Sequence, residues 1–552
     1  MSVERKINMK KKPFVLGTTL LTATLLLAGC GNNGGSGTSA ADYELENVEF
    51  PLQEEVSLHL MTSSSPLAPS DPNEKLIFKR LEEETGVHIE WNNIADDYAE
   101  KRNLAIAAGD LPDAMFNAEA SDKELLGWAE DGVIVPVNDL VDKYMPNLKA
   151  IYEKYPEYKE LATAPDGNMY SFPWIEELGE GKESIHTVNG MAWINVEWLD
   201  NLGLEMPETT DDLMVVLEAF KNEDPNGNGE ADEIPMSFID GNGNEDFKML
   251  LAAFGGDGDN DNHLVVNNDR SLNYTADDDS YREGIEYISE LYQKGLVDEE
   301  VFEQNWNSYV SKGNDQRYGV YFTWDKANVT GANENYDVLP VLEGPNGDKK
   351  VTRTNNFGFF RGRFVVTSAN KNLELTARWA DKMYDPIQSI QNNWGTYGDE
   401  EQQNIFTLGT NEAGEPMLQH APLEGTAPGE LRQKTEASGP LAVLDEYYGV
   451  YTTSPDDAQW RLDLMHEHYL EYIENDYNFP QMFMNVEDAN RIDQILADLN
   501  PYIYQQRAEW IIGGVTDESW DNYLAELERL NLSELMEIYE RNYETYISNS
   551  GE

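Results

Sequence analysis

A loop at residues 224–235 carries oxygen-bearing side chains at alternate positions. Its sequence is DPNGNGEADEIP, in which Asp, Asn, Asn, Glu and Asp are separated by single residues, two of them glycine. Side chains spaced in this way can converge on one point, and a hard divalent cation takes about six to eight such oxygens. A hydrophilic Asn-Gly turn is the plainer alternative, since that dipeptide is common in turns. Five alternate donors exceed what a turn needs, so we expect a bound cation.

The spacing matches the first half of an EF-hand calcium loop. Positions 1, 3, 5 and 6 of that loop are here Asp224, Asn226, Asn228 and Gly229. Glu230 would add its backbone carbonyl. The second half departs from the pattern, because position 12 is Pro235, so Asp232 and Glu233 must supply the closing carboxylates. Magnesium is disfavoured, since it demands strict octahedral geometry. We predict a structural calcium ion that pins the end of the preceding helix.

A second acidic stretch, Asp257–Asp261, also alternates its carboxylates. It lacks glycine at its sixth position and has no clear closing carboxylate, so the calcium pattern is incomplete. We expect a solvated acidic loop here and keep a second calcium loop as the alternative.

Aromatic residues in polar contexts could stack on the flat C–H faces of a sugar. The chain has 12 Trp and 29 Tyr, most of which must serve the core. Candidates near predicted strand ends or chain crossings are Tyr170, Trp174, Trp193, Trp306, Trp324 and Trp394. Polar candidates that could bind sugar hydroxyls are Asn189, Asp325, Arg353, Asn355 and Asn356. For the aromatic residues, ordinary packing in the core is the alternative.

Motifs of enzymes are not found. The segment His466-Glu-His468 does not continue as the zinc-protease HExxH, and neither a GxSxG elbow nor a GxxxxGK[ST] phosphate loop occurs. Asp and Glu number 103, so a pair of carboxylates is not in itself evidence for catalysis. The net charge of −64 also argues against nucleic acid as a partner, because phosphate binding needs a basic face.

The N-terminus has the pattern of a secretion signal. A basic stretch from Arg5 to Lys12 precedes an apolar run, Phe14–Leu27, that is shorter than the roughly 20 residues of a membrane-spanning helix. The run ends in LAGC, which resembles the bacterial lipobox and implies that Cys30, the only cysteine, is lipidated after removal of residues 1–29. Residues 30–51 would then be a lipidated cysteine with a flexible Gly/Ser/Asn tether. We expect a protein anchored by lipid to the extracellular face of a Gram-positive-like cell membrane.

The remaining chain alternates strands and helices. Residues 54–61 alternate as a strand, 73–85 have helical periodicity, 87–91 are a second strand, and 101–108 form a helix stopped by Gly109. This order predicts an α/β fold with a largely parallel sheet. Thr209 or Thr210 can cap a later helix, Ser533 can cap the last one, and the chain from about residue 485 onward is mainly helical.

Several segments together resemble the extracellular solute-binding proteins of ABC importers, in particular Gram-positive oligosaccharide-binding lipoproteins and alginate-oligosaccharide-binding proteins. They are NLAIAAGDLPD at 103–113, DGVIVP at 131–136, DLVDKYMP at 139–146, DGNMY at 166–170, and Ile194-Asn195 with Trp198-Leu199 and Leu202-Gly203. WIIGG at 510–514 and Trp520-Asp521-x-Tyr523 match the lipoprotein subgroup. The resemblance covers about residues 52–548, and its strength lies in the order and spacing of the segments.

The resemblance implies a type II, two-lobed fold like that of periplasmic binding proteins, with mixed, mostly parallel sheets flanked by helices and a hinge between lobes. Lobe one would be 52–190 plus 356–450, and lobe two 191–355 plus 451–548, with crossings near 189–195 and 355–364. The solute would bind between the lobes at strand ends, and the hinge would close over it. By the same resemblance, the ligands of the calcium loop are Asp224, Asn226, Asn228, Glu230, Asp232 and Glu233.

Two hypotheses of function remain. The first is a monomeric receptor that binds an oligosaccharide or other small solute and delivers it to ABC permease subunits without catalysis. The second is an anchored glycoside hydrolase or polysaccharide lyase, which would need two carboxylates about 5–10 Å apart across a sugar cleft. The high negative charge of the chain disfavours a polyanionic ligand. A local cluster of Arg353, Arg361 and Arg363 could nevertheless attract one. The alternative explanation for these arginines is ordinary charge balance on the surface.

Overall fold

The structure is a computed structural model, and it describes residues 47–54, 56–180, 183–331, 334–356, 358–423 and 428–550. The chain divides into two units, Met1–Ser39 and Ala40–Glu552, and all of the described residues belong to the second unit. The predicted signal peptide, Cys30 and nearly all of the tether lie outside the described residues. Among the described residues, no helix has both the length and the apolar character that crossing a bilayer requires.

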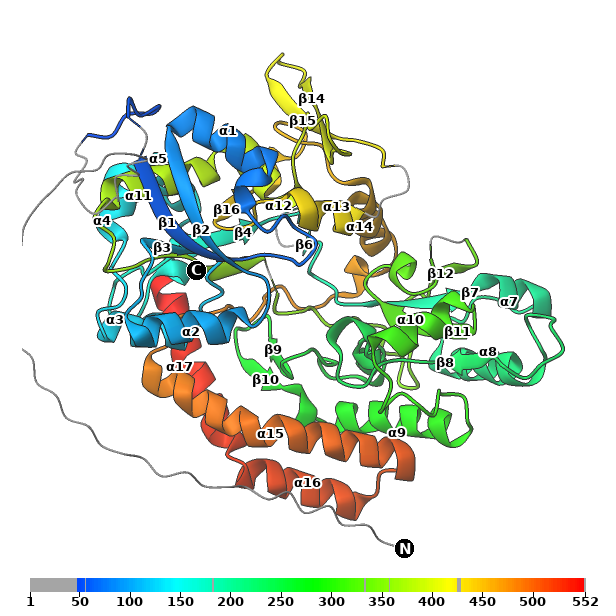
Figure 1. Cartoon of the computed structure of the whole chain (residues 1–552). Coiled ribbons are helices and arrows are strands. Elements are labelled where there is room, and N and C mark those ends of the chain that lie inside the picture. The colour runs from blue at the N-terminus through cyan, green and yellow to red at the C-terminus, as the bar shows by residue number, and fades with distance from the viewer. Residues whose placement is uncertain are drawn as a thin grey trace, which may run out of the picture. The chain divides into compact units, whose positions relative to one another are not determined.

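Within the described residues, six strands form the larger sheet, in the order β16-β4-β13-β3-β1-β2 (Figure 1). Their bounds are β1 Val56–Ser63, β2 Val87–Ile94, β3 Ala114–Phe116, β4 Phe172–Glu176, β13 Phe359–Val366 and β16 Leu441–Val443. β1 is parallel to β2 and β3, and β16 is parallel to β4, whereas β13 runs antiparallel to both of its neighbours. Along β1, Val56, Leu58 and Leu60 are buried and alternate with the more exposed Ser57 and His59, as the sequence predicts.

Helices flank this sheet and bury an apolar core against it. They are α1 Leu76–Thr85, α2 Tyr98–Ala108, α3 Asp122–Glu130, α4 Asn138–Tyr144, α5 Pro146–Lys154, α6 Pro156–Ala162, α11 Leu373–Asp381, α12 Pro386–Trp394 and α13 Pro428–Thr435. Gly109 ends α2 with a φ of 73°, which fits the left-handed cap that glycine adopts without strain. The core contains Leu58, Leu60, Phe116 and Phe364 from the strands.

Four strands form the second sheet of the described region, in the order β12-β7-β11-β8. They are β7 Met191–Asn195, β8 Ile234–Met236, β11 Tyr318–Thr323 and β12 Tyr336–Val338, of which only the pair β11–β8 is parallel. The helices α7 Val196–Leu202, α8 Thr210–Asn222, α9 Asp279–Gln293 and α10 Trp306–Asn314 accompany this sheet. The prediction for α8 is confirmed, because Thr209 is its N-cap and forms a reciprocal capping box with Asp212.

Long helices complete the C-terminal part. They are α14 Asp456–His468, α15 Val486–Gly513, α16 Asp517–Arg529 and α17 Leu532–Ser550, which confirms the predicted helical character after residue 485. The tyrosine hydroxyl of Tyr523 donates to Ala276 O at 3.0 Å, and this side chain is fully buried. The prediction for Ser533 is wrong: it lies inside α17, where its hydroxyl donates to Glu528 at 2.6 Å, because the helix begins one residue earlier.

Shorter elements connect these parts. The two-stranded pairs are β5 Gly179–Glu180 with β6 Glu183–Ser184, β9 Leu264–Val266 with β10 Leu272–Tyr274, and β14 Phe406–Thr410 with β15 Pro416–His420. The 3-10 helices are η2 Pro72–Glu74, η3 Gly243–Glu245, η4 Phe247–Phe254, η5 Thr275–Asp277, η6 Lys326–Asn328, η7 Lys382–Tyr384, η8 Asp445–Tyr447 and η9 Leu470–Tyr472.

Candidate functional site

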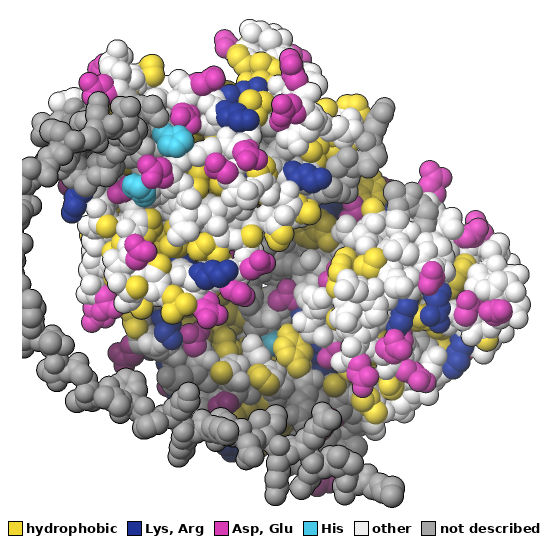
Figure 2. All heavy atoms as spheres, viewed as in Figure 1, with side chains coloured by type: hydrophobic (Ala, Val, Ile, Leu, Met, Phe, Trp, Pro, Cys, Tyr) yellow, Lys and Arg dark blue, Asp and Glu magenta, His cyan; other side chains and the backbone are white. Residues whose placement is uncertain are grey.

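A cavity of about 710 Å³ lies between residues of the first sheet and residues that precede and include β9. The lining residues fall into three groups: Glu119–Asp122 with Phe360–Arg363, Asn262 with Leu264 and Asn355, and Phe479–Met482 with Met484 and Tyr539. Figure 2 shows that the surface is hollowed near the centre of the view. The volume of the cavity falls within the range of about 300–1,000 Å³ that is typical of small-molecule sites.

An aromatic and cationic cluster forms one wall of this cavity. The ring of Phe360 is 51% exposed, although it lies within strand β13. Its centroid is 5.7 Å from that of Trp174, and the guanidinium carbon of Arg363 lies 5.3 Å from the Phe360 ring and 6.0 Å from the Trp174 ring. Burial lowers the pKa of Arg363, and its Nε has no hydrogen-bond partner among the described residues. A ring face beside an unsatisfied donor suits a sugar, which presents both C–H faces and hydroxyls.

Amide side chains form another part of the wall. Asn355, one of the residues singled out from the sequence, donates to Leu264 O at 2.8 Å and accepts from Phe479 N at 2.9 Å. Asn262 lies within 3.5 Å of it and also lines the cavity. Asn355 therefore holds together two parts of the wall that lie more than 100 residues apart in the sequence.

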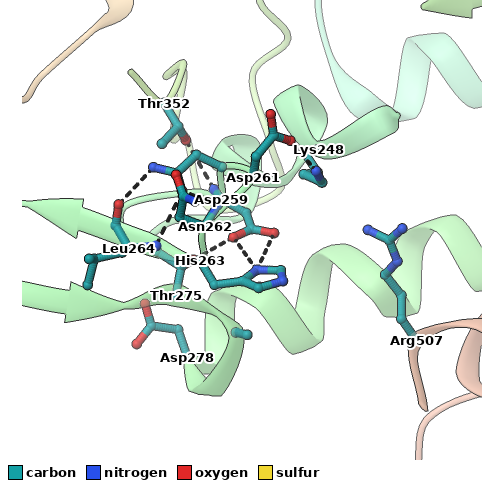
Figure 3. A network of polar contacts seen from close by, with 12 residues as sticks. Lys248, Asp259, Asp261, Asn262, His263, Leu264, Thr275, Asp278, Thr352 and Arg507 are labelled. Atoms are coloured by element: carbon teal, nitrogen blue, oxygen red, sulfur yellow. Dashed lines mark hydrogen bonds and ion pairs between the residues drawn. The ribbon is translucent and has the colours of Figure 1, made fainter. Parts of the chain in front are cut away.

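A buried polar network supports the loop that carries Asn262 (Figure 3). The carboxylate of Asp259 accepts a hydrogen bond from His263 Nδ1 at 2.8 Å, and the Asp259 backbone N–H donates to Thr352 Oγ1 at 3.1 Å. Burial acts to raise the pKa of Asp259, but the charge and hydrogen bond of His263 outweigh it, so the pKa lies below its usual value. The expectation of a solvated loop at Asp257–Asp261 is wrong for Asp259, whose exposed fraction is 3%, because the fold supplies buried partners.

The end of the same loop binds a lysine. Asp261 pairs with Lys248 and accepts a hydrogen bond from Asn189 Nδ2 at 2.7 Å. Burial acts to lower the pKa of Lys248, but the carboxylates of Asp246 and Asp261 raise it above its usual value. Asn189, which the sequence suggested as a ligand, is thus engaged with this loop.

Trp324 and Trp394 come together on one small apolar cluster. The buried members of that cluster are Leu178, Ile185, Ala458 and Leu462, and both tryptophans pack against it while remaining partly exposed. Arg461 of α14 covers Trp324, with its guanidinium carbon 3.5 Å from the ring centroid. The guanidinium of Arg432 lies 4.5 Å from the Trp394 ring. A guanidinium thus lies over each ring, while both tryptophans remain partly exposed.

The other sequence-derived candidates occupy different places. Trp193 is fully buried, stacks on Trp460 at 5.6 Å and donates its indole N–H to Thr323 O, so its ring serves the core. Tyr170 is buried, and its hydroxyl donates to Asp166 at 2.5 Å. Trp306 is 41% exposed at the start of α10, and Asp325 caps η6 through Ala327 N.

Charge balance on the surface does not explain the three arginines that were considered as a cluster. Arg353 is 3% exposed and donates to Asn475 O at 3.0 Å. Arg361 is 6% exposed and makes two hydrogen bonds to the carboxylate of Asp122, at 2.7 and 2.6 Å. Of the three, Arg363 alone combines a position in the cavity wall with an unpartnered nitrogen among the described residues.

Three residues of the cavity wall, Phe360, Asn262 and Glu119, were not singled out from the sequence. The available signal for Phe360 was its position in the strand FFRGRFVV, where it alternates with the buried Phe359 and Arg361. An aromatic residue at an outward position of a strand between buried neighbours indicates a binding surface, whereas Asn262 and Glu119 give no comparable signal.

Loop 224–235 brings the side chains of its alternate positions into contact with one another and with the loop backbone. Asn226 Nδ2 and Asn228 Nδ2 both donate to Asp232 Oδ1, at 3.2 and 3.0 Å, and Asp224 accepts from the backbone of Asn228 and Gly229. Burial, reinforced by the charges of Asp232 and Asp224, raises the pKa of Glu233, and its Oε1 is buried without a partner among the described residues. A cation would relieve this crowding of carboxylates, so the residues fit a calcium ion.

The donor set of the loop mixes amides with carboxylates. In the described part of the chain, no group of three or more His, Cys, Asp or Glu side chains is arranged to hold a metal ion. The loop is nevertheless fixed on both sides: Asn201 donates to Pro225 O and Arg317 donates to Asp232 O, each at 2.9 Å. These bonds join it to α7 and to the residue before β11.

The family pattern described as bacterial extracellular solute-binding protein matches residues 68–389 of this sequence. The chain belongs to the bacterial extracellular solute-binding protein family. The family resemblance inferred from the sequence segments is thereby confirmed, and the extracellular location that the family's description states agrees with the secretion pattern.

A curated relative extends the match to nearly the whole chain. It is the fructooligosaccharide ABC transporter substrate-binding protein FusA of Streptococcus pneumoniae serotype 4 (strain ATCC BAA-334 / TIGR4), which is 62% identical over 98% of this chain and 100% of its own length. This similarity supports the same family membership for the C-terminal helices, which lie beyond residue 389.

Two solved structures of the S. pneumoniae FusA protein share the fold of this family member. One is a complex with kestose, 64% identical, and the other is an EF-hand mutant in complex with fructo-nystose, 63% identical. Each covers 89% of this chain and 100% of its own, with a TM-score of 0.82. The predicted α/β, two-lobed fold of type II is confirmed, although the smaller sheet is mainly antiparallel.

Proposed function

We propose that this protein binds a fructo-oligosaccharide outside the cell and delivers it to the permease subunits of an ABC importer, acting as a monomer. The observation that carries the proposal is the 62% identity, over 98% of the chain, to a protein named for fructooligosaccharide transport. The cavity lined by Phe360, Arg363, Asn262 and Asn355 supports it, because the wall combines a ring face with donors and acceptors for hydroxyls.

Ligand contacts are proposed for two groups of residues. The first comprises Asn355, Phe360 and Arg363, which line the main cavity, and Trp174, whose ring contacts Phe360. The second lies on the small cluster beside α14 and comprises Trp324 and Trp394, with Asn189 near them. The proposal leaves out Trp193, since its buried ring already stacks on Trp460.

The protein is proposed to release its ligand chemically unchanged. Of the carboxylates that line the cavity, Asp122 is bound by two hydrogen bonds from Arg361, so a free pair of acids does not face the cavity from that position. Among the described residues, the cavity lining therefore gives no support to the glycoside hydrolase or lyase hypothesis.

The proposal also includes a lipid anchor and a structural metal ion. Cys30 would carry the lipid that holds the protein at the extracellular face of the membrane. Loop 224–235 would hold a structural calcium ion through Asp224, Asn226, Asn228, the backbone of Glu230, Asp232 and Glu233. The existence of a structure described as an EF-hand mutant of the pneumococcal relative supports this second part.

Calorimetric titration of the purified protein with kestose tests the proposal. We expect saturable binding, a shift in tryptophan emission and a higher melting temperature, because a ligand that binds only the folded state stabilises it. Fructo-oligosaccharides should be recovered intact by mass spectrometry. Lack of any response to kestose and longer fructo-oligosaccharides would contradict the binding proposal, and release of reducing ends would favour the enzyme.

A further inference from the structure

A second hollow, of about 380 Å³, lies at the carboxyl ends of three strands of the larger sheet. β1, β2 and β3 are parallel and end at Ser63, Ile94 and Phe116. The lining includes Ser63 and Ile94 themselves and Asn117, the residue that follows β3. In open α/β sheets, ligands bind outside the carboxyl ends of the strands. The hollow therefore occupies the edge of the sheet where a ligand is expected.

This hollow adjoins the main cavity. Glu119 lines both of them, and the charges of Glu119 and Glu436 both act on the guanidinium of Arg363 in the wall of the main cavity. Glu436 lines the second hollow as well. A chain-like ligand that fills the main cavity can therefore extend past Glu119 toward the ends of β1–β3.

A buried lysine faces this second hollow. Lys75 is 8% exposed, and its Nζ donates to Glu436 O at 2.7 Å. No carboxylate of the described residues forms a salt bridge with it, so two of its three N–H groups remain for other acceptors. Burial lowers the pKa of Lys75 to about 8, because the nearby charge of Glu436 offsets only part of the lost hydration. Burying an ammonium group with unused hydrogen-bond donors costs free energy of folding unless another group accepts those hydrogen bonds.

A buried hydroxyl contributes to the same wall. Tyr98, at the start of α2, is 8% exposed, and its hydroxyl has no hydrogen-bond partner among the described residues. Buried polar groups in native proteins are almost always hydrogen-bonded. Lys75 and Tyr98 come from different elements and yet leave hydrogen-bonding capacity at one hollow.

We propose that this hollow is a sugar subsite, in which Lys75 and Tyr98 bind the hydroxyls of one neutral hexose unit at the end of the chain held in the main cavity. The charges of Glu119 and Glu436 beside Lys75 leave no excess of positive charge, so the hollow suits a neutral polyol rather than an anion. This inference rests on the proposed function, because it assigns a place to one more unit of the same oligosaccharide.

The test measures affinity against chain length. Full-length protein in detergent, as wild type, K75M or Y98F, is titrated calorimetrically with fructo-oligosaccharides of three, four and five units. The wild type should bind the longer chains more tightly than the trisaccharide. We expect K75M to weaken binding of the four- and five-unit chains about tenfold and Y98F about threefold, while the affinity of both variants for the trisaccharide stays within about twofold of wild type.

Lys79 provides the matched control, because it is exposed on α1, the helix whose N-cap is Lys75. K79M should bind every chain as the wild type does. Equal losses for all chain lengths in K75M and Y98F, or no loss in either, would overturn the subsite while leaving the proposed function in place. If wild-type protein bound none of the three sugars, the proposed function would fail and the subsite with it.

Discussion

The guanidinium carbon of Arg461 lies 3.5 Å from the centre of the Trp324 ring, and the same group donates to backbone carbonyls of two separate segments. Hydrogen bonds of 2.7 Å reach Trp324 O, Val188 O and Asn189 O. Arg461 is 2% exposed and forms no salt bridge among the described residues, and burial lowers its pKa to about 9. One cation thus fixes the segment before β7 to the segment after β11.

Replacing this cation should destabilise the protein. R461M leaves three buried or partly buried carbonyls without their donor, so we expect a loss of about 2–4 kcal/mol in the free energy of unfolding. R461K should restore part of it, since an ammonium has three donors but no planar face to stack on the indole. Urea unfolding followed by tryptophan emission measures both effects. A urea unfolding curve for R461M that matches that of wild type would show that water replaces the guanidinium without cost.

The exposed ring of Phe360 gives a prediction for affinity. F360A should weaken fructo-oligosaccharide binding about three- to tenfold, because a sugar loses one stacking face while the strand β13 remains paired. F360W should retain the affinity. L408A, which truncates an exposed residue on the hairpin strand β14, is the control. Calorimetry that finds equal affinities for F360A and L408A would remove Phe360 from the site.

Removal of calcium should lower stability without unfolding the chain. Chelation by EDTA, or the variant D224A, is expected to lower the free energy of unfolding by about 2–3 kcal/mol at calcium concentrations near 100 times the dissociation constant. Added calcium should restore the melting temperature of the wild type but not of D224A. E412A, in the exposed turn between β14 and β15, should respond to EDTA as wild type does. Identical melting of wild type with and without EDTA would refute a structural ion.

The pH dependence of stability should change in D277N. Burial and the charge of Asp278 raise the pKa of Asp277 to about 6, above its value in the unfolded chain. The folded protein therefore holds this proton more tightly, and ionisation costs stability as the pH rises from about 4 to 6. D277N should stabilise the protein by about 1 kcal/mol at pH 7.5, a figure reduced for partial exposure, and by nothing at pH 4. The same gain in stability at pH 4 and at pH 7.5 would exclude ionisation of Asp277 as the cause. The control variant E412Q should show no gain at either pH.

Lys75 should show the opposite trend. Its folded pKa of about 8 lies below the unfolded value, so the protonated form costs stability below pH 8, and this cost disappears as the pH rises toward 10.5. K75M is therefore expected to be more stable than wild type at pH 7, by about 1–2 kcal/mol after loss of the bond to Glu436 O. The gain should shrink at pH 10. A destabilised K75M at pH 7 would show that the ammonium supports the fold.

Local signals in the sequence located much of the fold. The alternation of Val56, Leu58 and Leu60, the capping residues at Thr209 and the stop at Gly109 depend on neighbours only, and the structure confirms each of them. The polar side chains of loop 224–235 contact one another for the same reason, because a tight loop brings its own residues together. Ser533 was misplaced since a helix can begin one residue before a good cap when tertiary packing favours it.

The binding walls depended on contacts between distant segments. The sequence made Trp193 and Trp324 equal candidates for ligand binding. The sheet buries the first ring, whereas the second is partly exposed beneath Arg461, 137 residues away. Likewise, Asp259 has the sequence context of a solvated loop, yet His263 and Thr275 enclose it. By itself, the sequence determined the elements, the loop and the family. Only the tertiary structure decided which polar and aromatic side chains share a cavity, because burial is set by which distant surfaces pack together.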